Sequence, residues 1–263
     1  MDLKNSTILI TGGTSGIGLE LVRQLTEKGA KIIVTGRRLE ALNETKKQFR
    51  DIHTFQSDAG SPEDTRRLFE EVTRQFPDLN IIINNAGEMR LIDMLDSSKS
   101  LENLMREIDI NLSGTIRMVH QFLPHLVKKQ SAAIVNVSSA IAFMAYSSAP
   151  VYSASKAGVH AFTMALRLQL KGTNVKVLEF IPPGVNTNLQ NEWILQPNPR
   201  QMMDADKVVQ VAIKGLQNDT PEIMPALVKI IKFLGHIIPK ALMNFGHREF
   251  QRFRQLNNQL KKT

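Results

Sequence analysis

Apolar residues along the chain follow two alternating patterns. Runs of four to seven mainly apolar residues, the length of buried strands, occupy positions 7–11, 31–35, 52–56, 80–83, 133–137 and 175–181. Between these runs, apolar residues recur at the three- and four-residue spacing of amphipathic helices. Because strands and helices alternate at least five times, the pattern predicts a doubly wound α/β domain. Its parallel sheet, of about seven strands, would carry helices on both faces.

Signals at the ends of the helical segments agree with this division. The first helical segment ends at Gly29, which favours a helix stop. Ser61 and Pro62 open the third helical segment as a cap and a first helical residue, and acidic residues follow in the first turn. The chain shows no internal repeat and no linker, so we expect a single domain over 1–263.

Composition excludes several classes of protein. Hydrophobic residues make up 42% of the chain and charged residues 22%, which are the values of an ordinary globular protein. The chain has no cysteine, which excludes disulfides, thiol nucleophiles and cysteine-ligated metals, and its six histidines show no metal-ligand spacing. The first residues lead directly into a strand without the apolar core of a signal peptide. We therefore expect a cytoplasmic protein without a bound metal.

Positive charge is concentrated toward the C-terminus. The net charge is +8, and residues 221–263 contribute eight Lys or Arg against two Glu, which is +6 in 43 residues. The preceding 220 residues therefore carry only +2. Because the body lacks a basic stripe interleaved with aromatic residues, we expect no nucleic-acid partner.

The basic C-terminal extension, 221–263, contains an apolar segment at 226–245 with interspersed lysines and Pro239. These residues make a membrane-spanning helix implausible. Either the segment packs against the rest of the protein or a neighbouring subunit, or residues 226–263 lie on an anionic membrane surface. The last stretch, 247–263, is expected to be a solvent-facing basic helix.

The sequence TGGTSGIG at 11–18 lies between the first strand and the first helix. In that place, glycines permit a tight turn, let the backbone approach a pyrophosphate, and bring phosphates to the free N–H groups of the helix start. The spacing of Gly12, Gly16 and Gly18 differs from the commoner dinucleotide fingerprint, and a plain tight turn is the alternative.

Two arginines at the end of the second strand bear on the choice of cofactor. An acidic residue at this place binds the ribose 2′-hydroxyl of NAD, whereas this chain has Arg37 and Arg38. Guanidinium groups can grip a 2′-phosphate in a bidentate manner, so the pair favours NADP(H) over NAD(H). A solvated arginine pair is the alternative.

Tyr152 is one of two tyrosines, and it lies four residues before Lys156 in a segment of helical pattern, 150–171. Residues four apart share one face of a helix. A neighbouring ammonium lowers the pKa of a phenol from its usual value of about 10, which makes the phenol usable as an acid or base. Ser138 and Ser139 end the fifth strand, at the edge of the sheet where a cofactor crevice is expected.

Together these motifs resemble the short-chain dehydrogenase/reductase family. The resemblance spans about 7–187 and includes TGGTSGIG, NNAG at 84–87, Asn111, Ser139, YSASK at 152–156 and PPGVNT at 182–187. It implies a Rossmann-like fold and an NADP(H)-dependent oxidoreductase that transfers hydride between the nicotinamide and a carbonyl or secondary alcohol. A catalytically silent nicotinamide-sensing or scaffold protein on the same fold is the alternative.

The resemblance also implies a role for each catalytic residue. Tyr152 would exchange a proton with the substrate oxygen, and Lys156 would lower its pKa and hold the cofactor ribose. Ser139, with Ser138 as the alternative, would hydrogen-bond the substrate oxygen. Asn111 would order a water that connects Lys156 to solvent, although a local hydrogen bond alone would also explain an asparagine inside a helix.

The resemblance implies cofactor contacts from several segments. Asp58 would meet the adenine, 85–87 the adenine ribose, and Val185 and Thr187 the carboxamide. The full set is Gly12, Thr14, Ser15, Gly16, Ile17, Gly18, Arg37, Arg38, Asp58, Ala59, Asn85, Ala86, Gly87, Tyr152, Lys156, Pro183, Gly184, Val185 and Thr187.

Substrate-pocket residues are expected near the tyrosine and in 188–203, which follows the Pro-Gly motif where the family has a mobile lid. No fixed cation for an anionic group is evident, so we expect an apolar carbonyl or alcohol as substrate. The candidate lining residues are Met89, Phe143, Met144, Ala149, Trp193, Ile194, Met202 and Met203. Filling of the core is the alternative role for several of them.

Two helical segments, 104–126 and 152–170, are apolar over wide faces. Such faces favour a subunit interface, and the family resemblance implies a homodimer or homotetramer.

Overall fold

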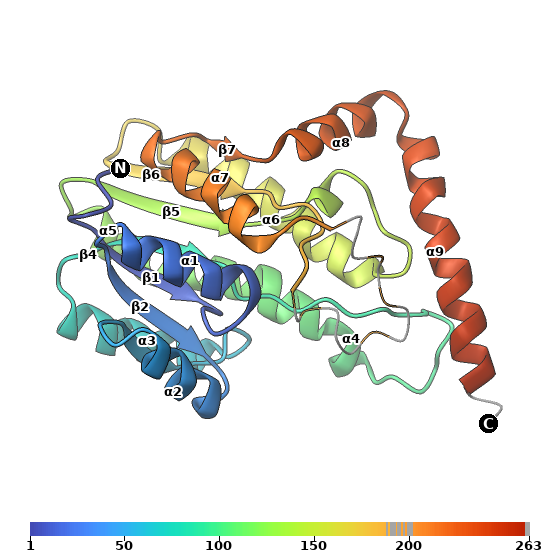
Figure 1. Ribbon diagram of the computed structural model, residues 1–263, viewed down its shortest axis with the longest axis horizontal. Coiled ribbons are helices and arrows are strands. Elements are labelled where there is room, and N and C mark those ends of the chain that lie inside the picture. The colour runs from blue at the N-terminus through green and yellow to red at the C-terminus, as the bar shows by residue number, and fades with distance from the viewer. Residues whose placement is uncertain (188, 190–192, 194–195, 197, 199–201, 261–263) are drawn as a thin grey trace.

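A parallel sheet runs through the middle of the molecule (Figure 1). The computed structural model describes residues 1–187, 189, 193, 196, 198 and 202–260, apart from the side chains of 245, 246 and 257–260. The described residues form seven parallel strands in the spatial order β3-β2-β1-β4-β5-β6-β7. The strands are β1 (Thr7–Thr11), β2 (Lys31–Gly36), β3 (His53–Gln56), β4 (Leu79–Asn84), β5 (Ala132–Val137), β6 (Val175–Phe180) and β7 (Glu222–Ile223).

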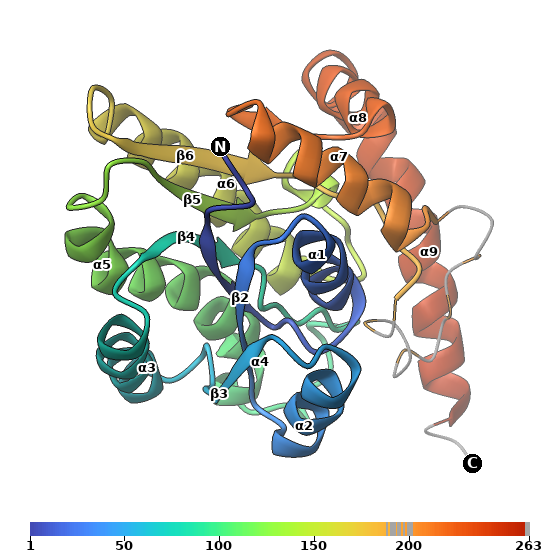
Figure 2. The same ribbon diagram turned by 60° about the vertical axis from the view of Figure 1, so that its left-hand side comes forward.

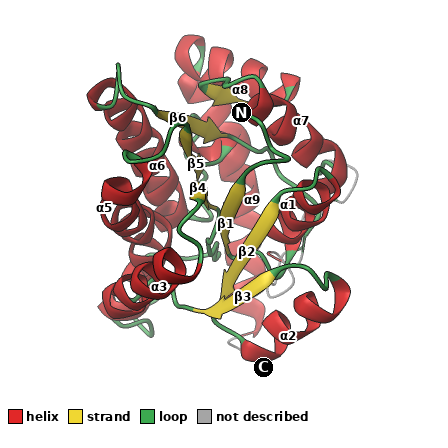
Figure 3. Cartoon of the chain, turned by 90° about the vertical axis from the view of Figure 1, so that its left-hand side faces the viewer, coloured by secondary structure: helices red, strands yellow, loops and turns green. Residues whose placement is uncertain are grey.

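Helices cover both faces of the sheet (Figure 3). They are α1 (Gly16–Glu27), α2 (Leu39–Gln48), α3 (Pro62–Gln75), α4 (Leu101–Glu107), α5 (Gly114–Leu126), α6 (Pro150–Gln169), α7 (Ala205–Gln217), α8 (Ala226–Ile237) and α9 (Pro239–Leu260). The apolar sides of α1, α2 and α7 form one core with the sheet, and those of α3, α5 and α6 form the other. The doubly wound α/β fold predicted from the sequence is therefore confirmed.

Six of the strands lie within a residue of their predicted positions. They were visible because both faces of a parallel sheet are covered, so strands such as β1 and β5 are buried along their whole length and read as continuous apolar runs. The seventh strand, β7, has only two residues and pairs with the end of β6. A strand of that length produces no apolar run in the sequence.

The order of the strands creates an opening at one edge of the sheet. From β1 the chain passes through α1 to β2 and β3 on one side, and then crosses to β4 on the other side of β1 (Figure 2). The connections at the carboxyl ends of β1 and β4 therefore diverge, and in such sheets a crevice forms at that point.

The C-terminal helices α8 and α9 follow β7, which lies at the opposite edge of the sheet from β3. Helix α9 runs along one side of the molecule (Figures 1 and 2). Val228 and Ile231 of α8 pack over the ends of β5 and β6. Most of α9 is exposed, as expected, but Phe253 is only 5% exposed. Arg254 Nε lies 3.2 Å from Asp93 Oδ2, which attaches α9 to the chain after β4. Phe253 is thus the point at which this mostly exposed helix packs on the rest of the protein.

Among the described residues, no helix combines the length and the hydropathy that are needed to cross a membrane.

Candidate active site

A cavity of about 1210 Å³ opens at the carboxyl ends of β1, β2, β4 and β5, and the glycine turn forms part of its wall. Gly12 and Gly16 have φ angles of 65° and 52°, which favour glycine. A Cβ atom on Gly18 would lie 2.2 Å from the Gly12 carbonyl oxygen. Asn85 Nδ2 donates to the carbonyls of Thr11 and Gly12 over 3.0 and 3.2 Å, which fixes the turn. This cradle at the start of α1 fits a dinucleotide pyrophosphate, because its glycines have no side chains and let the phosphates approach the backbone N–H groups.

The cavity lining includes most of the residues expected to contact a cofactor. Those that line it are Gly12, Thr14, Ser15, Gly16, Ile17, Gly18, Arg37, Arg38, Asp58, Ala59, Asn85, Ala86, Gly87, Tyr152, Lys156 and Thr187. Pro183, Gly184 and Val185 are outside the lining. Val185 is buried in the core beside α7, because its backbone forms a β-bridge with Met203. Its expected contact with a carboxamide therefore could involve only its backbone.

Arg37 and Arg38 line the cavity beside the glycine turn, together with Thr14 and Ser15. The Arg37 guanidinium is 47% exposed and lies 3.8 Å from Glu88 Oε2. Both arginines therefore stand at the end of β2 where the ribose of a bound dinucleotide is expected.

Tyr152 lies in the first turn of α6, and its buried phenol is hydrogen-bonded to the Ser139 hydroxyl. Ser139 Oγ also accepts a hydrogen bond from Ile141 N over 3.3 Å, so its hydrogen is available to an oxygen in the site. Burial raises the pKa of Tyr152, Ser139 opposes this shift and the Glu107 carboxylate adds to it, and the net pKa is about 12. The phenol is therefore protonated at neutral pH.

Lys156 lies one turn further along α6 and is also buried. Its Nζ donates to the Val137 carbonyl over 2.8 Å and lies 5.7 Å from the centre of the Tyr152 ring. Burial lowers the pKa of Lys156 to about 8, although the Glu179 carboxylate opposes the shift. We expected Lys156 to lower the pKa of Tyr152. In the protein alone the burial of the phenol is the largest effect and raises its pKa, so the role of Lys156 in lowering it stays a prediction.

Asn111 is fully buried in a short π-helical stretch, Ile108–Ser113, between α4 and α5. Its side chain accepts from Glu88 N over 2.9 Å and donates to the Glu88 carbonyl over 2.9 Å and to Ser155 Oγ over 3.0 Å. Asn111 therefore joins the chain after β4 to α6. A widened helical turn of this kind is frequent at functional sites.

The two serines that end β5 have different partners. Ser138 Oγ donates to Glu179 Oε1 over 2.5 Å, and His160 Nδ1 lies 2.8 Å from Glu179 Oε2. Ser138 is therefore directed toward a buried carboxylate on β6, whereas Ser139 meets the phenol of Tyr152. Ser138 is among the residues that line the cavity and Ser139 lies outside the lining, so the contact of Ser139 with Tyr152 is what supports its predicted role.

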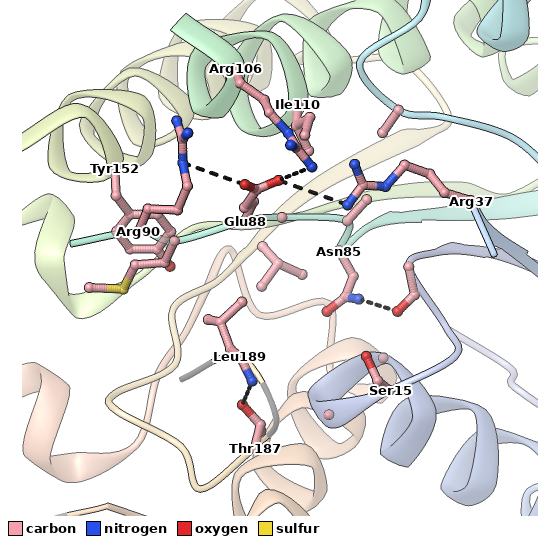
Figure 4. Close-up of a pocket in the computed structure, with 18 of the residues that line it drawn as sticks. Ser15, Arg37, Asn85, Glu88, Arg90, Arg106, Ile110, Tyr152, Thr187 and Leu189 are labelled. Carbon is pink, nitrogen blue, oxygen red and sulfur yellow. Dashed lines mark hydrogen bonds and ion pairs between the residues drawn. The ribbon is translucent and has the colours of Figure 1, made fainter. Parts of the chain in front are cut away.

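Glu88, directly after the NNAG motif, is surrounded by three arginines (Figure 4). Its carboxylate lies 2.9 Å from Arg106, 3.4 Å from Arg90 and 3.8 Å from Arg37. The sequence analysis missed this cluster because its members come from separate segments. Arg90, Arg106 and Lys99 all line the cavity, so the expectation that no fixed cation stands there was wrong.

Apolar side chains from three segments line the cavity beyond Tyr152. They are Met89 and Leu91 after β4, Leu189 and Trp193 after β6, and Phe253 of α9. Trp193 Nε1 donates to the Met89 carbonyl over 3.1 Å, which joins two of these segments. Phe253 lies 101 residues beyond Tyr152 in the sequence, and no local pattern marked it as a lining residue.

Several predicted pocket residues lie elsewhere. The Phe143 ring lies 5.0 Å from the His160 ring and 5.3 Å from Lys232 Nζ, and it packs with α8. Met144 and Ala149 are outside the lining, although Ala149 packs beside Met89 and Tyr152. Met202 and Met203 are also outside it, and Met203 packs on the core. Ile194 and most of 188–203 lie outside the described residues.

Comparisons with known proteins agree with this geometry. A family model described as short chain dehydrogenase matches residues 6–198. An uncharacterized oxidoreductase, DltE, of Bacillus subtilis (strain 168) is 38% identical over 224 residues, which cover 85% of this chain and 89% of that protein. An uncharacterized oxidoreductase of Staphylococcus saprophyticus is 30% identical over 82% of this chain and 93% of its own length.

Two solved structures are similar over most of the chain. A short chain dehydrogenase from Burkholderia cenocepacia J2315 in complex with NADP gives a TM-score of 0.79 at 25% identity, over 92% of this chain and 97% of that one. A short-chain dehydrogenase from Sphingobium yanoikuyae in complex with NADPH gives 0.77 at 25% identity, over 84% and 88%. The fold and the glycine cradle define a dinucleotide-binding α/β protein. The chain belongs to the short chain dehydrogenase family and is an oxidoreductase.

Proposed function

We propose that the protein is a cytoplasmic, NADP(H)-dependent oxidoreductase acting on the carbonyl or secondary alcohol of an apolar substrate. The observation that carries the proposal is the buried phenol of Tyr152, which lines the crevice, meets Ser139, and stands one helical turn from Lys156. The nicotinamide, when bound, supplies or accepts the hydride. The protein side chains bind the two reactants and handle the proton.

Proton transfer is assigned to Tyr152. Its raised pKa keeps the phenol protonated at neutral pH, so in the reducing direction it can donate its proton to the substrate oxygen. The Ser139 hydroxyl donates a hydrogen bond to the same oxygen and stabilises the charge that develops there. Lys156, as an ammonium, stabilises the phenolate left on Tyr152, because both groups lie on one face of α6 away from bulk water.

Asn111 has a positioning role in this proposal. It holds the backbone of Glu88 on one side and Ser155 of α6 on the other, which fixes the distance between the chain after β4 and the Tyr152–Lys156 turn. We also assign to it the ordering of a water that connects Lys156 with solvent.

NADP(H) is the proposed cofactor because Arg37 and Arg38 line the cavity at the end of β2. The two similar structures above were solved with NADP and NADPH. Replacing both residues (Arg37→Ala with Arg38→Ala) is expected to raise the KM for NADPH by about ten- to a hundredfold and to change the KM for NADH little. Arg66→Ala, on the surface of α3, serves as the control. An equal change for the two cofactors would contradict the assignment.

An apolar substrate is proposed because Met89, Leu91, Leu189, Trp193 and Phe253 line the cavity beyond the phenol. The arginines that also line it share the Glu88 carboxylate, and Arg90 is paired with Glu107 as well, so part of their charge is neutralised within the protein. A small apolar ketone or aldehyde therefore suits this end of the cavity better than an anion.

The second candidate function is a nicotinamide-sensing or scaffold protein without turnover. NADPH oxidation with a panel of ketones and aldehydes distinguishes the two, with Tyr152→Phe as the decisive variant. We expect this variant to lose about a hundred- to ten-thousandfold in kcat and to bind NADPH normally in a fluorescence titration. Absence of turnover by the unmodified protein over the whole panel, with NADPH bound, would favour the sensor.

We also propose a homodimer or homotetramer that uses the outer faces of α5 and α6. Ile116 of α5 and Met164 and Leu168 of α6 are exposed there. Light scattering after size-exclusion chromatography measures the subunit number, and a monomer would contradict the assignment.

A further inference from the structure

Helix α8 is apolar on two opposite sides. Val228 and Ile231 face inward and pack over the ends of β5 and β6. The outer α8 face, which we define as Leu227, Ile230, Phe233, Ile237 and Ile238, is exposed, and Phe233 is 64% exposed. A helix with apolar residues all round needs cover on both sides, and a contiguous exposed apolar patch marks a surface of interaction.

Basic residues accompany the outer α8 face. Lys229 and Lys240 are exposed, and in the described part of the chain neither forms an ion pair. Lys232, in contrast, is paired with Glu222 on β7. The extension to which α8 belongs carries +6 over 43 residues. A partner that suits this face therefore has an apolar region next to negatively charged groups.

A second copy of the chain suits this face poorly. Two copies that met through it would bring two strongly basic extensions together, and like charges repel across such an interface. The apolar residues on α5 and α6 offer a separate surface for self-association.

The dimensions of α8 exclude a spanning arrangement. Twelve residues of α-helix measure about 18 Å, whereas the hydrocarbon core of a bilayer is about 30 Å thick. A short helix with an apolar face and flanking lysines instead lies parallel to the surface of a bilayer, with its apolar side chains among the acyl chains.

We propose that the outer α8 face binds the surface of a membrane that contains anionic lipids. Phe233, Ile230 and Ile237 enter the apolar boundary of the bilayer, while Lys229 and Lys240 meet the anionic headgroups. Membrane binding of this kind is peripheral and weakens as salt screens the headgroup charge. It does not depend on the proposed reaction.

Sedimentation of the full-length protein with lipid vesicles tests the proposal. We expect binding to vesicles of phosphatidylcholine mixed with phosphatidylglycerol at low salt, and much weaker binding to pure phosphatidylcholine. Phe233→Asp is expected to lower the partition coefficient, calculated from the fraction of protein that sediments with the vesicles, by about ten- to a hundredfold. Replacing Lys229 and Lys240 by Glu should lower it by about tenfold and remove the difference between the two kinds of vesicle.

The matched control is Leu101→Asp, which makes a comparable change on an exposed leucine of α4, away from α8 and from the proposed subunit interface, and is expected to leave vesicle binding unaffected. NADPH binding by each variant verifies that it is folded. No sedimentation of the unmodified protein with anionic vesicles at low salt would overturn the proposal, and so would unchanged binding by Phe233→Asp. If Phe233→Asp instead lowers the subunit number without any vesicle binding, the face is an interface between copies and the proposal is wrong.

Discussion

The two ends of the cavity are built in different ways. At the cofactor end, the glycine turn, Asn85 and the two arginines follow directly from the strands β1, β2 and β4, and the Asn85 side chain fixes the turn through two carbonyls. At the substrate end, the lining comes from the chain after β4, from residues between β6 and α7, and from α9. Residues of the cofactor end directly follow strands, so the sheet determines their positions. Residues of the substrate end come from segments that are far apart in the sequence.

This difference indicates how each end tolerates change. Backbone atoms form much of the cofactor end, so a methyl group added at the turn would clash with backbone that cannot easily move. Side chains such as Trp193 and Phe253 form the substrate end, and their removal leaves a larger space without moving the sheet. Changes at the first end should therefore abolish binding, and changes at the second should alter preference among substrates.

The largest effect is expected for Gly18→Ala. The new Cβ would lie 2.2 Å from the Gly12 carbonyl oxygen, so the turn must shift and lose the shape that receives the pyrophosphate. We expect NADPH affinity to fall by about a hundredfold, with a loss of about 1–3 kcal/mol in the free energy of unfolding. Fluorescence titration with NADPH and thermal unfolding measure the two quantities.

Gly215→Ala is the matched control for this variant. A Cβ at Gly215, in α7, would lie 2.6 Å from side-chain atoms of Ile223, so it also forces a shift, but Gly215 is outside the cavity lining. We expect it to lower the stability and to bind NADPH within about threefold of the unmodified protein. A Gly18→Ala protein with normal affinity would show that the cradle is not where the cofactor phosphates bind.

The same difference explains what could be predicted from the sequence. Gly12, Arg37 and Tyr152 were found because their positions relative to strand ends are encoded locally, by a turn, a strand end and a spacing of four on one helix. Phe253 could not be found, because its burial depends on how α9 meets the chain after β4. Phe143 was misplaced for a related reason, since the partner that turns it away from the cavity is α8.

The pKa values of the site residues also could not be predicted from the sequence. A spacing of four places Tyr152 and Lys156 on one face, and this was predicted correctly. The net direction of the pKa shift of Tyr152 in the protein alone could not be predicted from the motif, because it depends on the depth of burial of the phenol and on the distant carboxylate of Glu107. A motif gives the partners of a titratable group along the chain, but burial is a property of the whole fold.

A smaller effect is expected for Phe253→Ala at the substrate end. Removal of the ring takes an apolar side chain from the cavity wall and enlarges the cavity. We expect KM for the best ketone to rise about five- to tenfold, with kcat and NADPH affinity little changed. Steady-state kinetics with ketones of increasing size measures the effect.

Phe250→Ala is the matched control, because Phe250 lies one turn earlier on α9, is half-buried and is outside the cavity lining. It should leave the order of preference among ketones unchanged. Equal effects of the two variants would show that α9 acts on the pocket through its general packing and not through the Phe253 ring.

The smallest effect is expected in the pH dependence of activity, which tests whether the charged form of Lys156 is needed. Lys156 has a pKa lowered to about 8, so kcat/KM for carbonyl reduction should fall as the pH rises through that value, because the ammonium loses its proton while Tyr152 keeps its own.

The buried carboxylate of Glu179 favours the charged form of Lys156 and opposes the effect of burial. Glu179→Gln removes that charge with little change in shape, so the pKa of Lys156 should decrease and the falling limb of the profile should move to lower pH by about half to one unit. Glu222→Gln, which removes a carboxylate paired with Lys232 on β7, should leave the limb in place. A limb that stays unmoved in Glu179→Gln would mean that another group sets the upper limit of activity, and Lys156 would lose its assigned role in stabilising the phenolate.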